Sequence, residues 1–187
     1  MGIFLFFLWG VFGCVIPITK KDKSWIPYTK GETIFFRSSE GKLDSIYIEN
    51  IRTITPKGIT GFFKPQWINV IESRNDSIIT AIHHKKVVRQ TQSTLFSVTT
   101  GIPLIEEQKI SIGIKNFGFN GKVSELESRR LDSIELQGKN FMNVFMLEEY
   151  PKFYTIKDST DIEKVYWDKE VGLIGFIQYD GILWLKH

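Results

Sequence analysis

The chain has 187 residues with a formal net charge of +3, and 42% of its residues are hydrophobic and 24% charged. This length suits one domain with a real core, and the composition is that of a folded protein rather than a disordered one. The small net charge excludes a chain dominated by a basic surface, so we expect no nucleic acid among its partners.

The first residues form an apolar leader that ends at the only cysteine of the chain. Every residue from Ile3 to Phe12 except Gly10 is apolar, as in the central region of a secretory signal. The stretch Val11-Phe12-Gly13-Cys14 resembles a bacterial lipobox, in which a small residue precedes a cysteine that is then acylated. We therefore predict a lipoprotein signal peptide over residues 1–13 and lipidation of Cys14, with palmitate-type acyl chains as the membrane anchor.

Other interpretations of this leader remain open. A transmembrane helix needs about 20 apolar residues, whereas Ile3–Ile18 has sixteen and contains Pro17. A buried strand is disfavoured by the lysines that begin at Lys20. The third alternative is an ordinary leader in which Cys14 is an incidental thiol. No Lys or Arg precedes the apolar run, so either a basic segment lies upstream of Met1 or the run is an anchor with its N-terminus outside.

Beyond the leader we expect a tether over residues 14–24 and a single β domain over 25–187. The chain contains one alanine, Ala81, and twenty-six isoleucines, a usage that favours strands, although an AT-rich genome produces the same bias. Alternating apolar residues predict strands at Thr33–Phe36, Leu43–Thr55, Trp67–Glu72, Ser77–Arg89, Thr94–Thr99, Ile110–Ile114, Leu131–Leu136, Asn143–Leu147, Val171–Tyr179 and Ile182–Leu185.

Turn-forming residues separate these strands at short intervals. The last turn, Asp180-Gly181, predicts a two-residue hairpin that pairs Tyr179 with Ile182 and Ile177 with Trp184. The other predicted turns are Ser39–Gly41, Pro56–Gly58, Arg74–Asp76, Asn120-Gly121 and Gln137–Lys139, and short helices are possible at Val123–Leu131 and Asp161–Lys164. The pattern predicts a mainly β fold: an antiparallel meander curled into a half-barrel or barrel, with few short helices.

Both ends of the domain resemble uncharacterised lipoproteins of the Bacteroidota. The resemblance rests on Trp25–Ile48, "WIPYTKGETIFFRSSEGKLDSIYI", and on Val165–His187, "VYWDKEVGLIGFIQYDGILWLKH". With "LQGKNFMNVF" before the Gly-Leu-Ile strand, the order is also similar to envelope domains with a LolA-like or lipocalin-like half-barrel. The resemblance implies a curved sheet with an apolar concave side and, because Val15-Ile16-Pro17 rather than acidic residues follow Cys14, the periplasmic face of the outer membrane.

No pattern of catalytic or metal-binding residues is present in the sequence. His83 and His84 are adjacent, so in a strand they point to opposite faces and do not share a metal ion. The neighbouring Lys85, Lys86 and Arg89 suit either an anionic partner or a solvated strand face. The acidic pairs Glu106-Glu107, Glu125 with Glu127, and Glu148-Glu149 are unremarkable in a chain with 21 acidic residues. We expect no enzyme, no cofactor and no metal site.

Aromatic residues are the candidates for binding. In a small β fold most of them form the core, but some line ligand clefts. We take Trp67, Trp167, Trp184 and Phe36 as candidate ligand-binding residues. The function expected from the sequence is that of a lipid-anchored envelope protein that binds an apolar ligand or an envelope partner. The alternatives are an accessory subunit of an outer-membrane complex and an envelope enzyme.

Overall fold

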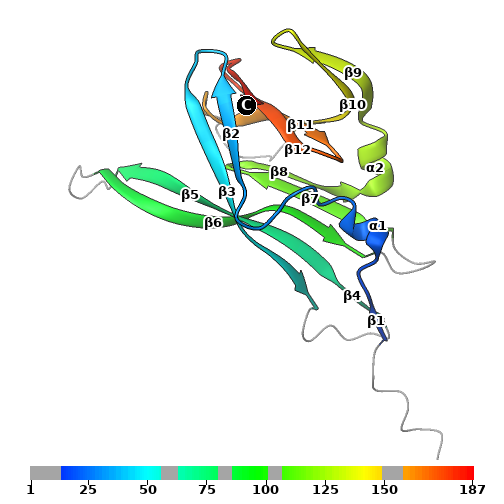
Figure 1. The fold of residues 1–187 in the computed structure, drawn as a ribbon. Coiled ribbons are helices and arrows are strands. Elements are labelled where there is room, and N and C mark those ends of the chain that lie inside the picture. The colour runs from blue at the N-terminus through cyan, green and yellow to red at the C-terminus, as the bar shows by residue number, and fades with distance from the viewer. Residues whose placement is uncertain (1–13, 56–62, 80–85, 101–106, 149–157) are drawn as a thin grey trace, which may run out of the picture.

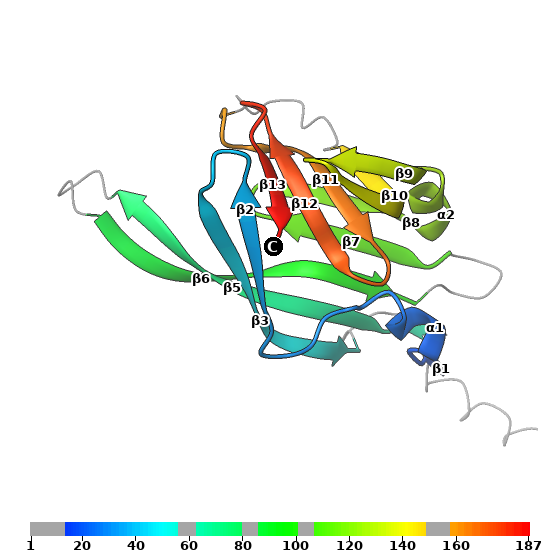
Figure 2. The same ribbon diagram turned by 45° about the horizontal axis from the view of Figure 1, so that its top comes forward.

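The structure of the protein is a computed structural model that describes residues 14–55, 63–79, 86–100, 107–148 and 158–187. One antiparallel sheet of 11 strands curls into a half-barrel (Figures 1 and 2), which confirms the predicted fold class. The described helices are short: α1 (Lys20–Lys23) and α2 (Val123–Glu127). The strands are β1 (Cys14–Ile16), β2 (Thr33–Ser38), β3 (Leu43–Ile54), β4 (Phe63–Pro65), β5 (Trp67–Ile79), β6 (Lys86–Thr99), β7 (Lys109–Ile114), β8 (Phe117–Lys122), β9 (Arg130–Leu136), β10 (Lys139–Glu148), β11 (Ile162–Asp168), β12 (Gly172–Gln178) and β13 (Leu183–Lys186).

The two ends of the domain meet in the middle of the sheet. The strand order is β8-β7-β6-β5-β3-β2-β13-β12-β11-β10-β9, so β2 and β13 pair with each other in the middle. On one side of this pair the strands follow in sequence order from β3 to the edge strand β8, and on the other side they run backwards from β12 to the edge strand β9. In that central pair, Trp184 lies opposite Ser38 and Leu185 opposite Arg37. The outermost strands, β8 and β9, are consecutive in the sequence, and α2 connects them.

The inner face of the curl holds the main hydrophobic core. In β2 burial alternates strictly: Ile34, Phe36 and Ser38 are buried and the residues between them are exposed, as the period of two in a strand requires. Trp25 and Tyr28, which precede β2 in the chain, are buried in the same core. The segment before β2 therefore helps to fill the concave side of the sheet.

A second, smaller core lies on the opposite face of the C-terminal strands. In β12, Leu173 belongs to the main core while the next residue, Ile174, belongs to the second one. These strands are therefore apolar on both faces, whereas an antiparallel sheet with one wet face alternates apolar and polar residues. The buried members of the second core come one each from β9 to β13: Leu136, Val144, Tyr166, Ile174 and Leu185.

The segment expected to be a tether, residues 14–24, contains two elements. β1 pairs in parallel with β4, and α1 begins with a capping box in which Asp22 Oδ2 accepts hydrogen bonds from the backbone N and the hydroxyl of Thr19, both at 2.6 Å. Asp22 Oδ1 accepts a third bond, from Gln108 Nε2 at 2.6 Å, which fixes α1 to the segment before β7. Contacts with the domain thus begin before Trp25.

The turn predicted at Asn120-Gly121 is wrong, because both residues lie inside β8, opposite Ser111 and Ile110. A Cβ added at Gly121 would lie 2.6 Å from Glu125 Oε2 and 2.7 Å from Phe119 Cζ, so this glycine leaves room for these two side chains. The actual β7–β8 turn is at Lys115, which adopts a positive φ of 51°.

Two other local predictions are wrong as well. The polar run Arg74–Asp76 does not form a turn but continues β5, where it pairs with residues 89–91 of β6. The helix predicted at Asp161–Lys164 is the start of β11, because Ile162 and Val165 join the main core as strand residues. The helix predicted over Val123–Leu131 is present but ends at Glu127.

The C-terminal hairpin forms, but with a register that differs by one residue from the predicted one. Ile177 pairs with Leu183, and Phe176 pairs with Trp184. The loop is one residue longer because Gly181 adopts a φ of 84° and Asp180 Oδ1 accepts a hydrogen bond from the backbone N of Ile182 at 2.9 Å. A shift of one residue exchanges the faces of a strand, and this shift places Trp184 beside Phe176 in the main core.

Candidate functional site

Three of the four aromatic candidates lie in the main core. Trp167 is fully buried, stacked on Phe96 at 4.6 Å between ring centroids and edge-on to Tyr28 at 5.6 Å. Phe36 is also fully buried, with its ring centroid 5.7 Å from that of Phe176. These rings contact other rings of the protein, and they form part of the packed interior.

Trp184, on β13, packs against the same group of aromatic rings. Its ring stacks on Phe176 at 5.9 Å, and its indole N–H donates to Gln178 Oε1 at 2.7 Å. The ammonium group of Lys115 lies over both rings, 5.6 Å from the centroid of Trp184. Trp67 is the fourth candidate; it is partly exposed at the start of β5, opposite Ile54 and Thr99.

Polar groups also reach the interior. The hydroxyl of Tyr28 accepts a hydrogen bond from the backbone N of Leu173 at 2.9 Å, and burial raises the pKa of this hydroxyl far above its ordinary value. Glu72 is only 1% exposed, and its Oε1 accepts from the hydroxyl of Ser93 at 2.6 Å. The sequence does carry a signal for this buried acid, since Glu72 continues the inward alternation of Ile68 and Val70.

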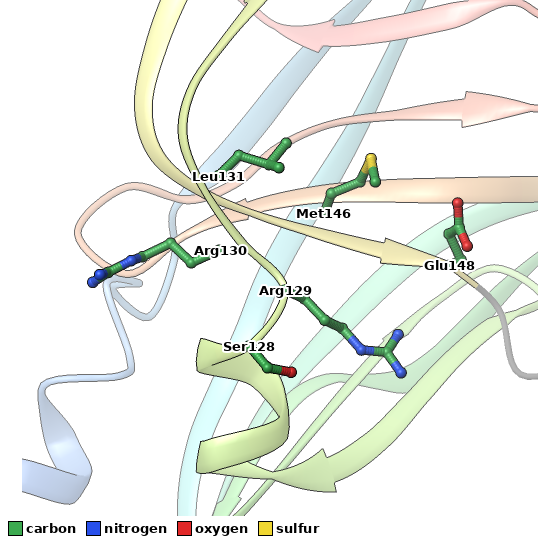
Figure 3. A pocket seen from close by; sticks show the side chains of 6 residues that line it. All are labelled: Ser128, Arg129, Arg130, Leu131, Met146 and Glu148. Carbon is green, nitrogen blue, oxygen red and sulfur yellow. The ribbon is translucent and has the colours of Figure 1, made fainter.

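A surface pocket lies where α2 runs into β9. Its volume is about 400 Å³, within the range of small-molecule sites. Figure 3 shows that Leu131 and Met146 lie on one side of it, and that Arg129 and Arg130 point in different directions. The six residues that line the pocket are Ser128, Arg129, Arg130, Leu131, Met146 and Glu148.

The charged groups of this pocket are already engaged with other side chains. Arg129 donates to Glu125 Oε1 at 3.0 Å and its guanidinium lies 5.2 Å from the ring centroid of Phe119, while Arg130 lies 3.6 Å from Glu127. The ammonium group of Lys164 lies 3.3 Å from Glu148, and this hydrogen bond raises the pKa of the lysine. Each of these positive charges is therefore paired with a carboxylate, so the pocket is no simple anion site.

The outer face of the β2–β3 hairpin carries a second surface feature. Phe35, Leu43 and Tyr47 are 54%, 67% and 43% exposed. In the register, Phe35 lies opposite Ser45, so Leu43 and Tyr47 are its diagonal neighbours on the same face. We call these three residues the outer apolar patch; it occupies the middle of the sheet rather than an edge.

Most of the remaining polar candidates are not described. His83, His84, Lys85, Glu106 and Glu149 lie outside the described residues. Within the described part of the chain no three His, Cys, Asp or Glu side chains could hold a metal ion, and no helix there is long and apolar enough to cross a membrane. Cys14 is the first residue of β1.

Comparison with known proteins gives no match, whether to a protein-family model, a curated protein or a solved structure.

Proposed function

We propose that this protein is a lipid-anchored protein of the cell envelope, without catalytic activity, that binds a protein partner through the outer apolar patch. Attachment through Cys14 and a location on the periplasmic face of the outer membrane are parts of the same proposal. It rests on one observation above all: the concave side of the half-barrel is filled by the protein's own aromatic side chains, while large apolar side chains are exposed on the convex side.

The packed interior favours a partner over an interior ligand. A carrier with a LolA-like cup needs free apolar volume on the concave side, but Trp25, Tyr28 and Trp167 occupy that side and contact further rings. An interior ligand would have to displace side chains that are at most 6% exposed. Opening such a core costs the free energy of its buried area, about 25 cal/mol per Å².

The outer apolar patch suits a protein partner. Exposed apolar residues that stand alone are common, whereas three at diagonal positions on one sheet face suit an interaction surface. Arg37 lies opposite Leu43 on the same face, and a guanidinium nitrogen of Arg37 lies 3.1 Å from His187 Nε2. Aromatic residues and Arg are enriched in protein–protein interfaces, so the expected partner presents an apolar surface with acceptors for the guanidinium.

The test is crosslinking in the native envelope, with the complexes identified by mass. A variant with Phe35→Ser, Leu43→Ser and Tyr47→Ser should lose a crosslinked complex that the unmodified protein forms. The control is Met142→Ser with Val171→Ser and Tyr179→Ser, whose side chains are 58%, 50% and 42% exposed but lie outside the patch. Loss of the complex in the control as well, or its survival in the patch variant, would refute the proposed surface.

The pocket beside α2 supports a second candidate, the binding of a small amphiphile. Leu131 and Met146 offer apolar contact to a ligand in the pocket of about 400 Å³, and charged side chains lie at its rim. Mass spectrometry of the intact protein under native conditions should then show a bound molecule that Met146→Trp expels and Met142→Trp, on the same strand but exposed, retains. A protein recovered without any bound molecule would exclude this candidate.

A further inference from the structure

Helix α1 presents a uniformly cationic surface to solvent. Lys20, Lys21 and Lys23 are all exposed, and the only acid of the helix, Asp22, is buried at 7% exposure. The carboxylate of Asp22 is directed inwards, where Thr19 and Gln108 donate hydrogen bonds to it. The fold thus removes the one negative charge of the helix from its surface and leaves three positive charges there.

The chain that leads into α1 is held where β4, the partner of β1, leads into β5. The backbone N of Ile18 donates to Gln66 Oε1 at 3.0 Å, and the backbone N of Gln66 donates to Thr100 Oγ1 at 2.9 Å. Gln66 Nε2 donates to Thr55 Oγ1 at 2.9 Å, so the ends of β3, β5 and β6 all meet near this link. The chain between Cys14 and α1 is therefore bonded to the sheet rather than free.

The distance between Cys14 and the lysines is short. Lys20 is six positions after Cys14, a stretch that spans at most about 20 Å even when fully extended. In Figures 1 and 2, β1, β4 and α1 lie together at one end of the molecule, whereas the turns of the β2–β3 and β9–β10 hairpins lie at the other. An acyl chain on Cys14 would thus bring α1, and not the hairpin turns, to the membrane surface.

We infer that α1 is a second contact with the membrane, in which Lys20, Lys21 and Lys23 rest on the head groups of anionic phospholipids. The inference depends on the proposed anchoring and adds an orientation to it: the domain lies on the bilayer with α1 down. Each lysine near an anionic bilayer favours binding by about fivefold. The attraction falls within a Debye length, about 10 Å at moderate salt, so it needs the closeness that β1 provides.

Lys169 belongs to the same end of the molecule. Its ammonium group lies 4.4 Å from the ring centroid of Trp25, the residue that follows α1 and Ser24. Within the part of the chain that the structure describes, Glu107 precedes Gln108 and has its carboxylate bound by Ser124, and Glu170 follows Lys169. Neither is on α1, so the helix surface itself stays positive.

The test measures the accessibility of individual lysines. The full protein, as recovered from its membrane, is reconstituted into vesicles of phosphatidylcholine alone or with phosphatidylglycerol and treated with a membrane-impermeant amine reagent. We expect labelling of Lys20, Lys21 and Lys23 to fall several-fold on the anionic vesicles and to recover in high salt. Lys42 and Lys139, at the hairpin turns, are controls in the same molecule and should label equally on both vesicles.

A pair of variants makes the test quantitative. Replacing Lys20→Gln and Lys23→Gln should weaken the attraction of α1 to the anionic surface by about fivefold for each lysine removed, so that most of the protection of Lys21 is lost. Replacing Lys42→Gln and Lys139→Gln removes the same charge elsewhere and should leave Lys21 protected. Equal labelling of Lys21 on both vesicle types in the unmodified protein would overturn the inference.

The intact mass of the same sample separates this inference from the proposed anchoring. An acylated protein that floats with both vesicles but shows no protection refutes the helix contact alone. A protein without acyl mass that floats only with anionic vesicles, and is protected on α1, refutes the anchor but supports the contact. A protein that floats with neither refutes both.

Discussion

Phe35 and Phe36 are neighbours in β2 with the same side chain, but their surroundings differ completely. Phe36 is fully buried and packs against Phe176, whereas Phe35 is 54% exposed on the other face of the same strand. The fold explains Phe36, because the inner face of the curl is the core. It does not explain Phe35, since a polar residue at that position would suit an outer face equally well.

The comparison extends to the neighbouring strand. Ile46 and Ile48 are buried on the inner face of β3, while Leu43 and Tyr47 are exposed on its outer face. An inner face full of aromatic rings stabilises the domain, and an outer face with three exposed apolar residues contributes little to its stability. The apolar side chains that a partner could contact therefore lie on the outer face of the sheet.

The first prediction compares the two phenylalanines directly. Phe36→Ala should lower the free energy of unfolding by about 3–5 kcal/mol, because it leaves a cavity beside Phe176. Phe35→Ala should change it by no more than about 0.5 kcal/mol, as for other exposed sites. Urea denaturation of the two variants measures both values. Equal losses would mean that Phe35 is covered in solution and that the outer apolar patch is not a free surface.

The second prediction makes the same comparison for two tyrosines. Tyr28→Phe removes the hydroxyl that accepts from the backbone N of Leu173 and leaves that buried N–H without its partner. The loss should be about 1–3 kcal/mol. Tyr47→Phe, on the exposed face, is the control and should be near neutral. Similar unfolding midpoints for both variants would contradict the assignment of Tyr28 to the closed interior.

The fold class could be predicted from the sequence because period-two alternation and turn residues are local signals. Thr33–Phe36 and Leu43–Thr55 match β2 and β3 closely, and the Gln137-Gly138 turn is where the sequence places it. The wrong predictions occur where contacts between residues far apart in the sequence determine the local structure. Gly121 looks like a turn residue, but it lies inside β8, where the side chains of Phe119 and Glu125 come close to it only in the folded chain.

The candidate site was harder to predict for the same reason. The size of an aromatic ring indicates that Trp67, Trp167, Trp184 and Phe36 could bind a ligand, but size does not tell which face of a sheet a ring occupies. The outer apolar patch could have been found from alternation, since Phe35 and Phe36 are adjacent and must point to opposite faces. The pocket beside α2 joins residues from two strands and a helix end, which no local pattern links.

The third prediction concerns the loop that decides which face Trp184 occupies. Gly181 has a φ of 84°, and Gly181→Ala should cost about 1 kcal/mol because a Cβ is disfavoured in that conformation. The control is Gly118→Ala in β8, where an added Cβ meets no atom within 4 Å and φ is not positive. Thermal unfolding of both variants tests the conformation of Gly181. Equal stability would show that Gly181 does not hold a positive φ in solution and that the loop differs from the one described.

The smallest expected effect is at a surface contact that depends on charge. Hydrogen bonds from the hydroxyl and the backbone N of Ser124, at 2.8 and 2.7 Å, stabilise the carboxylate of Glu107 at the start of α2 and lower its pKa below the usual 4.5. A lowered pKa in the folded state contributes stability that is present above the unfolded pKa and is lost as the pH falls through the folded one. NMR titration should therefore show Glu107 protonating below pH 4.5, with the Ser124 amide shifting at the same midpoint. Glu107→Gln should abolish that shift. A midpoint at the ordinary value would show that the contact is not formed in solution, and α2 would then lack this cap.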